Sequence, residues 1–233
     1  HARFDAKERE YTYIISQHKN PFRRYSAWQY YVALDFDKMN LAAEKANALL
    51  TAWYPGGEGG HAIADVLFGD YNPAGRLPVS IARNEGQLPI YYSKGKQRAY
   101  MDGEANALYS FGYGLSYTKF EYSDLQIKPG NGKDILQTVT CTVKNTGDRD
   151  GQEIVQLYIR DMVASIAQAP ILLKAFERVE LKKGESKTVT FNLGKQELSI
   201  YNAALEEVVE PGDFKVMVGA ASNDIRLEGM FKL

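Results

Sequence analysis

Apolar and polar residues alternate along five stretches in the second half of the chain. In a β-strand, successive side chains point to opposite faces, so an alternation of apolar and polar residues is typical of a strand with one buried face. The breaks between these stretches carry the glycine, proline, asparagine and aspartate residues that turns prefer. Short strands at this spacing are typical of a β-sandwich, so we expect one over residues 119–233. The stretches are FEYSDLQI (120–127), LQTVTCTV (136–143), EIVQLYIR (153–160), KTVTFNL (187–193) and FKVMVGA (214–220).

A helical period dominates residues 32–80. Apolar residues recur every three or four positions in LAAEKANALLTAW (41–53) and in HAIADVLFG (61–69). The stretch TAWYPGGEGG (51–60) places a short apolar run before four glycines. We therefore expect a strand, a glycine-rich turn and a helix in succession, a unit typical of α/β domains. The prolines of DYNPAGRLPVS (70–80) then end the helix.

The other two segments show no regular period. Residues 1–31 are aromatic and charged, and residues 81–118 are rich in tyrosine. A tyrosine has an apolar ring and a polar hydroxyl, so such a segment can pack on a surface without forming helices or strands. We expect residues 81–118 to be a linker of this kind. It would join the α/β part, residues 32–80, to the β-sandwich, residues 119–233.

Composition excludes several classes of protein. The 233 residues carry a formal net charge of −1, which gives no argument for binding nucleic acid. No apolar run approaches the ~18 residues of a transmembrane helix, and the first residues lack the apolar region of a signal peptide. Cys141 is the single cysteine, so an internal disulfide and a cysteine-based zinc site are excluded. Its place in an alternating stretch predicts a buried thiol.

The glycine-rich turn fits a dinucleotide-binding pattern only in part. Residues 57–62 satisfy G-x-G-x-x-[GA] between a predicted strand and a predicted helix. Glu58, however, would put a negative charge where phosphates should lie. A second strand ending in an acidic residue should also follow about 20 residues on, and NPAGRLPVS occupies that place. We therefore expect no nucleotide and no other cofactor.

Acidic residues near this turn are the candidates for catalysis. Glu58 and Asp70 could pair as the two carboxylates of a glycosidase. The favoured interpretation is structural: Glu58 caps a helix, Asp70 follows its end, and His61 is a surface residue. Glu104 is a loop acid without an obvious partner. His1 and His18 lie in an unpatterned segment, so no metal site is predicted, and no G-x-S-x-G elbow is present.

Several long motifs in this order resemble glycoside hydrolase family 3, in particular its β-glucosidases and β-xylosidases. The resemblance covers about residues 32–233. It implies that the α/β-sandwich domain of that family ends here and that a fibronectin type III-like domain, an immunoglobulin-like β-sandwich, follows. The motifs are AWYPGGEGGHAIADVLFGDYNPAGRLPVS, LPIYY, LYSFGYGLSYTKFEYSDL, VTCTVKNTGDRDGQEIVQLYIRD and LKAFERVELKKGESKTVTFNL.

The resemblance gives the glycines a steric role, in a tight reversal that brings the helix close to the sheet. It also implies a retaining glycosidase whose nucleophile and acid/base precede the AWYPGGEGG motif. Neither role carries over to Glu58, Asp70, Asp102 or Glu104. We therefore predict no catalytic residue in this chain and no hydrolysis by the chain alone, although a full-length enzyme would cleave terminal β-linked sugars.

Two departures from the family pattern stand out. A buried apolar strand should precede Val32, but ISQHKNPFRRYSAWQYY carries Lys19, Arg23 and Arg24 there. We interpret residues 1–31 as unmatched, through truncation of the gene or a misread frame. A smaller departure is APILLKAF, which is less basic than the family's usual stretch between Pro170 and Phe176.

The alternative to a glycosidase fragment is a non-catalytic module that binds carbohydrate or serves a structural role. Its aromatic platform would come from the tyrosines of the linker, with Tyr113 as the residue to test. Anchoring of the linker is the favoured role for these tyrosines. The expected partners are a β-linked oligosaccharide in the full-length enzyme and, as one option, a second copy of the chain, with no nucleic acid and no membrane. The resemblance implies a periplasmic or secreted protein.

Overall fold

In the computed structural model, the described residues are 48–54, 56–83, 87–94, 105–132 and 134–233, with the backbone of residues 14–16 and 27–29. The chain divides into two compact units, residues 1–55 and 56–233. In the first unit, β1 (Ile14–Ser16) pairs in parallel with β2 (Ala27–Gln29).

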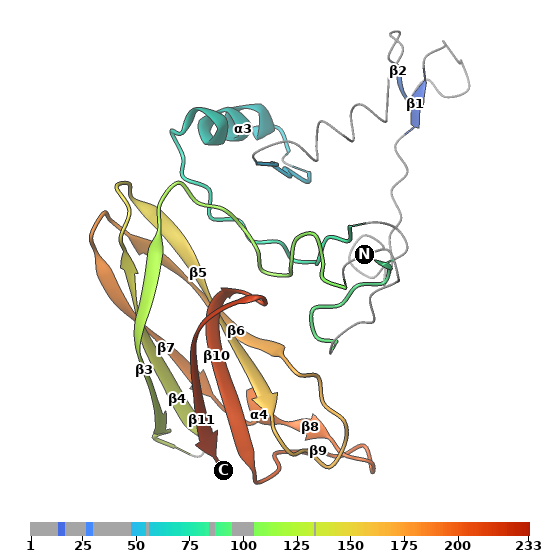
Figure 1. The fold of residues 1–233 in the computed structure, drawn as a ribbon, viewed down its shortest axis with the longest axis vertical. Helices are drawn as coiled ribbons and strands as arrows, with labels where there is room; N and C mark the ends of the chain where they lie inside the picture. The colour runs from blue at the N-terminus through green and yellow to red at the C-terminus, as the bar shows by residue number, and fades with distance from the viewer. Residues whose placement is uncertain are drawn as a thin grey trace. The chain divides into compact units, whose positions relative to one another are not determined.

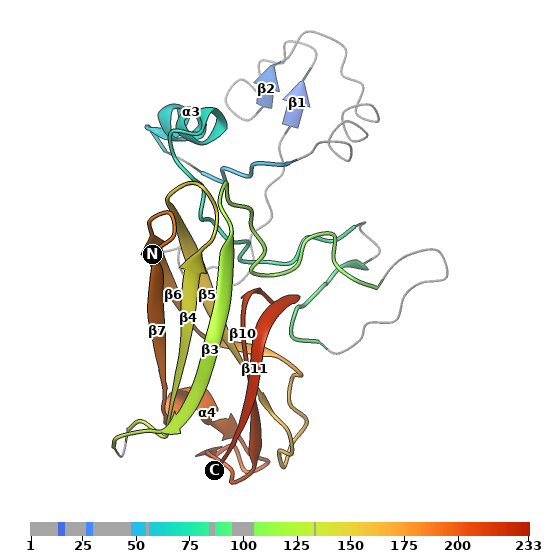
Figure 2. The ribbon, with the colours of Figure 1, turned by 60° about the vertical axis from the view of Figure 1, so that its left-hand side comes forward.

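The second unit contains two facing antiparallel sheets (Figures 1 and 2). In its described part, one sheet has the strand order β3-β4-β7 and the other the order β11-β10-β5-β6. The expected β-sandwich is therefore confirmed. The strands are β3 (Phe120–Pro129), β4 (Gln137–Asn145), β5 (Gly151–Asp161), β6 (Leu172–Leu181), β7 (Ser186–Leu193), β10 (Asp213–Ala221) and β11 (Asp224–Lys232).

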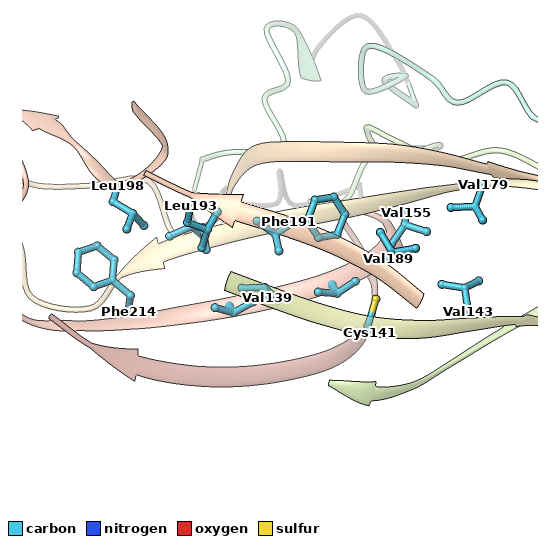
Figure 3. Close-up of a cluster of buried hydrophobic side chains, with 14 of the residues drawn as sticks. Val139, Cys141, Val143, Val155, Val179, Val189, Phe191, Leu193, Leu198 and Phe214 are labelled. Carbon is cyan, nitrogen blue, oxygen red and sulfur yellow. The ribbon is translucent and has the colours of Figure 1, made fainter. Parts of the chain in front are cut away.

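Short elements close one end of the sandwich. Helix α4 (Lys195–Leu198) follows β7, and β8 (Ile200–Tyr201) pairs with β9 (Glu207–Val208) as a small hairpin. The Glu197 carboxylate accepts a hydrogen bond from the Gly194 amide at 2.8 Å, which caps the start of α4. Leu198 then enters the core beside Leu193 (Figure 3).

The core lies between the two sheets and is built by the predicted alternation. Inward residues of β4 and β5 are fully or almost fully buried, and their outward neighbours are not part of the same cluster. Figure 3 shows Val139, Cys141 and Val143 of β4 facing residues from the opposite sheet. Burial raises the pKa of the Cys141 thiol to about 11, in agreement with its expected place in the core.

Two strands lay outside the five alternating stretches. Strand β6 pairs with β5 through a register shift between Leu157 and Tyr158, which breaks the period of two. Strand β11 has glycine at the inward position 229. A Cβ there would lie 2.8 Å from Ile127 Cδ1 of β3, so glycine stands at a position where the apolar pattern calls for a side chain. The alternation of burial itself continues along the whole of β11.

The helix predicted after the glycines is confirmed as α3 (Gly59–Phe68), but the prediction of a strand before them is wrong. Trp53 has φ 49°, a left-handed conformation that an extended strand does not allow. A strand also needs a partner for its hydrogen bonds, and the described residues provide none for residues 51–54. Of the helix expected over 41–53, residues 41–47 are outside the described part, and residues 48–53 are not helical.

The described residues of the tyrosine-rich segment, which is itself part of the second unit, contact the segment after α3 and the sandwich. Its residues 109–113 run antiparallel to residues 77–81, with the Leu77 amide donating to the Tyr113 carbonyl at 2.9 Å and the Ile81 amide to the Tyr109 carbonyl at 2.8 Å. Gln156, on the outer face of β5, donates from Nε2 to the Gly112 carbonyl at 3.1 Å. This segment thus covers part of the sheet that contains β5.

Candidate functional site

The GGEGG turn leads directly into α3, and Glu58 is the residue that precedes the helix. The Glu58 side chain makes no capping hydrogen bond within the described part of the chain. Its Oε2 instead lies 3.0 Å from Nδ1 of His61, and both side chains are nearly 90% exposed, at 89% and 88%. Glu58 therefore occupies the expected position just before the helix, but its side chain does not cap the helix as expected; His61 lies on the helix surface.

Of the two roles expected for the glycines of the turn, the described residues show one. Gly56 has φ 75°, so it supplies the reversal that the resemblance implied. Gly57 and Gly60 face open space: a Cβ on either would meet no described atom within 4 Å. The described residues therefore do not test the predicted close approach of the helix to a sheet, which stays a prediction. The sheet that would lie against α3 is not part of them.

The structure does not bring Glu58 and Asp70 together. They flank α3 at opposite ends, and a helix of ten residues is about 15 Å long. Two carboxyl groups of a retaining glycosidase lie only about 5–5.5 Å apart. Gly69, in a left-handed conformation with φ 84°, ends the helix just before Asp70. Asp70 is thus a residue of the turn after the helix.

The remaining candidate residues lie elsewhere. Asp102, Glu104, His1 and His18 are outside the described residues. Within the described part, no cluster of three or more histidine, cysteine, aspartate or glutamate side chains could hold a metal ion.

The tyrosines of the linker contact other groups of the chain. The rings of Tyr109 and Tyr113 stack with centroids 5.4 Å apart, and Tyr92 stacks on Phe111 at 4.2 Å. The Tyr92 hydroxyl also accepts a hydrogen bond from the Leu173 amide at 3.2 Å. These contacts favour the anchoring role over a glycan platform.

The most strongly built polar cluster is one that the sequence did not single out. The Glu153 carboxylate, 2% exposed, receives two hydrogen bonds from Arg76 Nη2, at 3.1 and 3.0 Å. Its Oε1 also accepts one from the Tyr122 hydroxyl at 3.0 Å. Burial, and then the Glu153 charge, raise the pKa of Tyr122 well above its usual range, so its hydroxyl remains a donor.

Arg226 flanks this cluster. Its guanidinium lies 4.7 Å from the centre of the Tyr122 ring, and its Nη1 donates to the Phe120 carbonyl at 2.8 Å. Nη2 of the same group pairs with Asp224 at 2.8 Å.

Asn72 makes a second connection to the sandwich. Its Oδ1 accepts hydrogen bonds from Ser116 Oγ at 2.9 Å and from the Tyr117 amide at 2.8 Å. Its Nδ2 donates to the Asp150 carbonyl at 2.9 Å. One side chain therefore joins the segment after α3, the end of the linker and the loop before β5.

Comparisons of sequence match two family profiles to the chain. The family profile described as the glycosyl hydrolase family 3 C-terminal domain matches residues 31–117, and that of the fibronectin type III-like domain matches residues 153–222. The chain is 42% identical over 204 residues to a periplasmic β-glucosidase of Salmonella typhimurium, covering 82% of the chain and 26% of that protein. It is 43% identical over 195 residues to a β-xylosidase of Formosa agariphila, covering 79% and 26%.

Solved structures give the same result. A β-glucosidase from Erythrobacter marinus superposes with a TM-score of 0.77 at 44% identity, over 83% of this chain and 26% of that one. A Listeria innocua β-glucosidase in complex with glucose gives a TM-score of 0.75 at 38% identity, over 82% and 28%.

The order of elements defines the end of an α/β domain followed by a fibronectin type III-like β-sandwich. The chain belongs to glycoside hydrolase family 3, of which it carries a C-terminal portion. It spans about a quarter of the length of the curated relatives that it matches, 26% for both proteins named above. None of the helices in the described residues is long and apolar enough to cross a membrane.

Proposed function

We propose that the chain is the C-terminal part of a β-glucosidase or β-xylosidase that removes terminal β-linked sugars with retention of configuration. The observation that carries this proposal is the long match to enzymes with both names, at 42% and 43% identity over most of the chain. The sugar and the linkage are left open, because the two names differ in the sugar.

Within that enzyme, the chain supports the catalytic machinery. Glu58 and Asp70 are exposed and lie at opposite ends of α3, which argues against a carboxylate pair formed by them. We assign the nucleophile and the acid/base to other parts of the full-length protein. The proposed organisation has an α/β end at residues 32–80, a linker at 81–118 and the sandwich at 119–233, after an unmatched segment at 1–31.

The proposed location of the full-length enzyme is the periplasm or the exterior of the cell. The support is that the similar Salmonella protein is a periplasmic β-glucosidase. The substrate of the enzyme, a β-linked oligosaccharide, would be met there. Fractionation of cells that produce the full-length protein, with activity assayed in each fraction, tests this location.

A chimera tests the assignment to the family's activity. The matched quarter of the Salmonella protein is replaced by residues 31–233 of this chain, and hydrolysis of p-nitrophenyl β-glucoside and β-xyloside is followed. We expect turnover, because the replaced part supplies support and not the reacting groups. A folded chimera without turnover would contradict the proposal.

The isolated chain provides the complementary test. Purified free of host glycosidases, it should hydrolyse neither substrate, and Glu58→Gln should change neither this result nor the activity of the chimera. If the isolated chain did turn over substrate, and Glu58→Gln abolished that turnover, the assignment of the catalytic carboxylates to other parts of the enzyme would be wrong.

A further inference from the structure

Glu153 joins three separate parts of the second unit through one buried carboxylate. Glu153 itself lies on β5 in one sheet, and Tyr122 lies on β3 in the other. Arg76 belongs to the segment 70–80 that leaves α3. All three hydrogen bonds end on the two oxygens of a side chain that is 2% exposed.

The geometry of the ion pair is not the one that gives the greatest attraction. A guanidinium and a carboxylate bind most strongly as a fork, with two nitrogens meeting two oxygens. Here Nη2 alone meets both oxygens, while Nε of Arg76 is buried without a partner among the described residues. Arg76 is 9% exposed, so water does not screen the pair. A buried ion pair of this kind often contributes little net stability and can instead favour one arrangement over others.

Close backbone contacts surround the pair and leave little room for a different arrangement. A Cβ on Gly151 would lie 2.7 Å from Asn72 Nδ2, and a Cβ on Gly114 would overlap the Gly75 carbonyl. Asn72 holds the same segment, four residues before Arg76, through its three hydrogen bonds. A rotation of the segment on the sandwich would break the Asn72 contacts and leave Glu153 as an unpaired buried charge.

We propose that Glu153 is a positioning residue that holds the segment 70–80, and with it α3, in one orientation on the fibronectin type III-like domain. In any other orientation of the segment 70–80, Arg76 would leave Glu153, and the buried carboxylate would lose the partner of its charge. That loss raises the free energy of every other orientation. This role does not depend on which sugar the full-length enzyme cleaves, or on its activity.

Distance measurements between spin labels on the 233-residue chain test the proposal. One label is placed at His61→Cys on α3 and the other at Thr190→Cys on β7, both exposed positions. Cys141 is buried, and a sample without the two new cysteines checks that it does not react. The parent should give one narrow distance distribution.

The deciding variant removes both charges together. R76M/E153M keeps side chains of similar length and leaves no buried charge, so it should unfold cooperatively while its distance distribution becomes at least twofold wider. The matched control is K215M/E228M, which removes the 2.8 Å pair between β10 and β11 and should keep the parent's width. A folded R76M/E153M with the parent's width would overturn the proposal.

Tyr122→Phe provides the test if the double variant does not fold. It keeps the ring beside Arg226 and removes one of the three hydrogen bonds to Glu153. Broadening of the distance distribution in this variant supports the positioning role. The parent's width in folded Tyr122→Phe would overturn it.

Discussion

The hydroxyl of Tyr117 donates a 2.6 Å hydrogen bond to the carbonyl of Val66, which joins a residue just before β3 to the last turn of α3. The last four carbonyls of a helix have no partner within the helix, so an outside donor stabilises its end. The guanidinium of Arg149 lies 6.0 Å from the centre of the Tyr117 ring and is near the same helix end. Helix α3 is thus held at its C-terminal end.

The rest of α3 has little packing in the described structure. Leu67 and Phe68 are 64% and 84% exposed, although both are apolar. We therefore expect proteases to cut the region around α3 while residues 119–233 resist, because the hydrophobic core cluster found among the described residues lies in the sandwich. Equal resistance along the whole chain would contradict this.

Tyr117→Phe should accelerate that cleavage. It removes a hydrogen bond worth about 1 kcal/mol and leaves the ring in place, so the helix should open more often. The measurement is the rate of limited proteolysis, with fragments assigned by mass. Tyr201→Phe, at an exposed position on β8, is the matched control, and proteases should cleave its α3 region at the same rate as in the parent.

Arg76→Met should be far more damaging than the removal of both charges. It leaves Glu153 buried and unpaired, which costs about 3–5 kcal/mol of the free energy of unfolding. R76M/E153M should recover most or all of that loss, since no buried charge remains. Urea denaturation of both variants gives the two free energies. A double variant as unstable as Arg76→Met would contradict the expectation.

Gly112→Ala should cost much more than Gly184→Ala, although both glycines have positive φ, at 81° and 76°. The left-handed conformation alone costs alanine about 1–2 kcal/mol, and Gly184 has open space around it. A Cβ on Gly112 would overlap the amide group of Gln156 and displace its buried hydrogen bonds to the Gly112 and Ala220 carbonyls. Thermal unfolding of the two variants compares the costs. Equal losses would show that Gln156 moves aside freely.

Ser165→Ala should destabilise the protein at neutral pH but not in acid. The Ser165 hydroxyl, and then its amide, donate to the Glu210 carboxylate and hold the pKa of that carboxyl below its usual range. A lowered pKa in the folded state stabilises above the unfolded value of about 4.3, and this contribution is lost as the pH falls through the folded value. The difference in Tm between parent and variant should therefore be constant above about pH 5 and shrink below about pH 4.

Melting curves from pH 3 to 8 measure this difference. Ser186→Ala, at an exposed serine of β7, is the control and should show no such dependence. A difference between Ser165→Ala and the parent that persists unchanged at pH 3 would mean that the Glu210 charge plays no part.

The sandwich could be predicted from the sequence because its core follows from alternation within single strands. Val155 and Leu157 of β5 are two residues apart and therefore face the core together, and this spacing can be read from the sequence. Strand β6 escaped prediction because a register shift interrupts that spacing, and β11 escaped because glycine replaces an apolar residue at its inward position 229. The strand expected at residues 51–54 failed for the opposite reason: its pattern was apolar, but a strand also requires a partner.

The buried cluster could be predicted only in part. Glu153 has the same phase as Val155 and Leu157, so an acid at an inward position was a readable signal. Its partners were not readable, because Arg76 is 77 residues away in sequence and Tyr122 is 31. Such pairs depend on how the two sheets and the segment after α3 meet.

The cover that the linker places on β5 has a consequence for cutting the protein into pieces. Gln156 and Tyr158 are buried on the outer face of that strand, beneath Gly112 and Tyr92. A fragment that began at residue 119 would keep every strand of the sandwich yet expose this face to solvent. The sandwich is therefore not a transferable cassette by itself: a soluble fragment should retain the tyrosine-rich segment, and a fusion junction belongs before Asn72, whose contacts attach that segment to the sandwich.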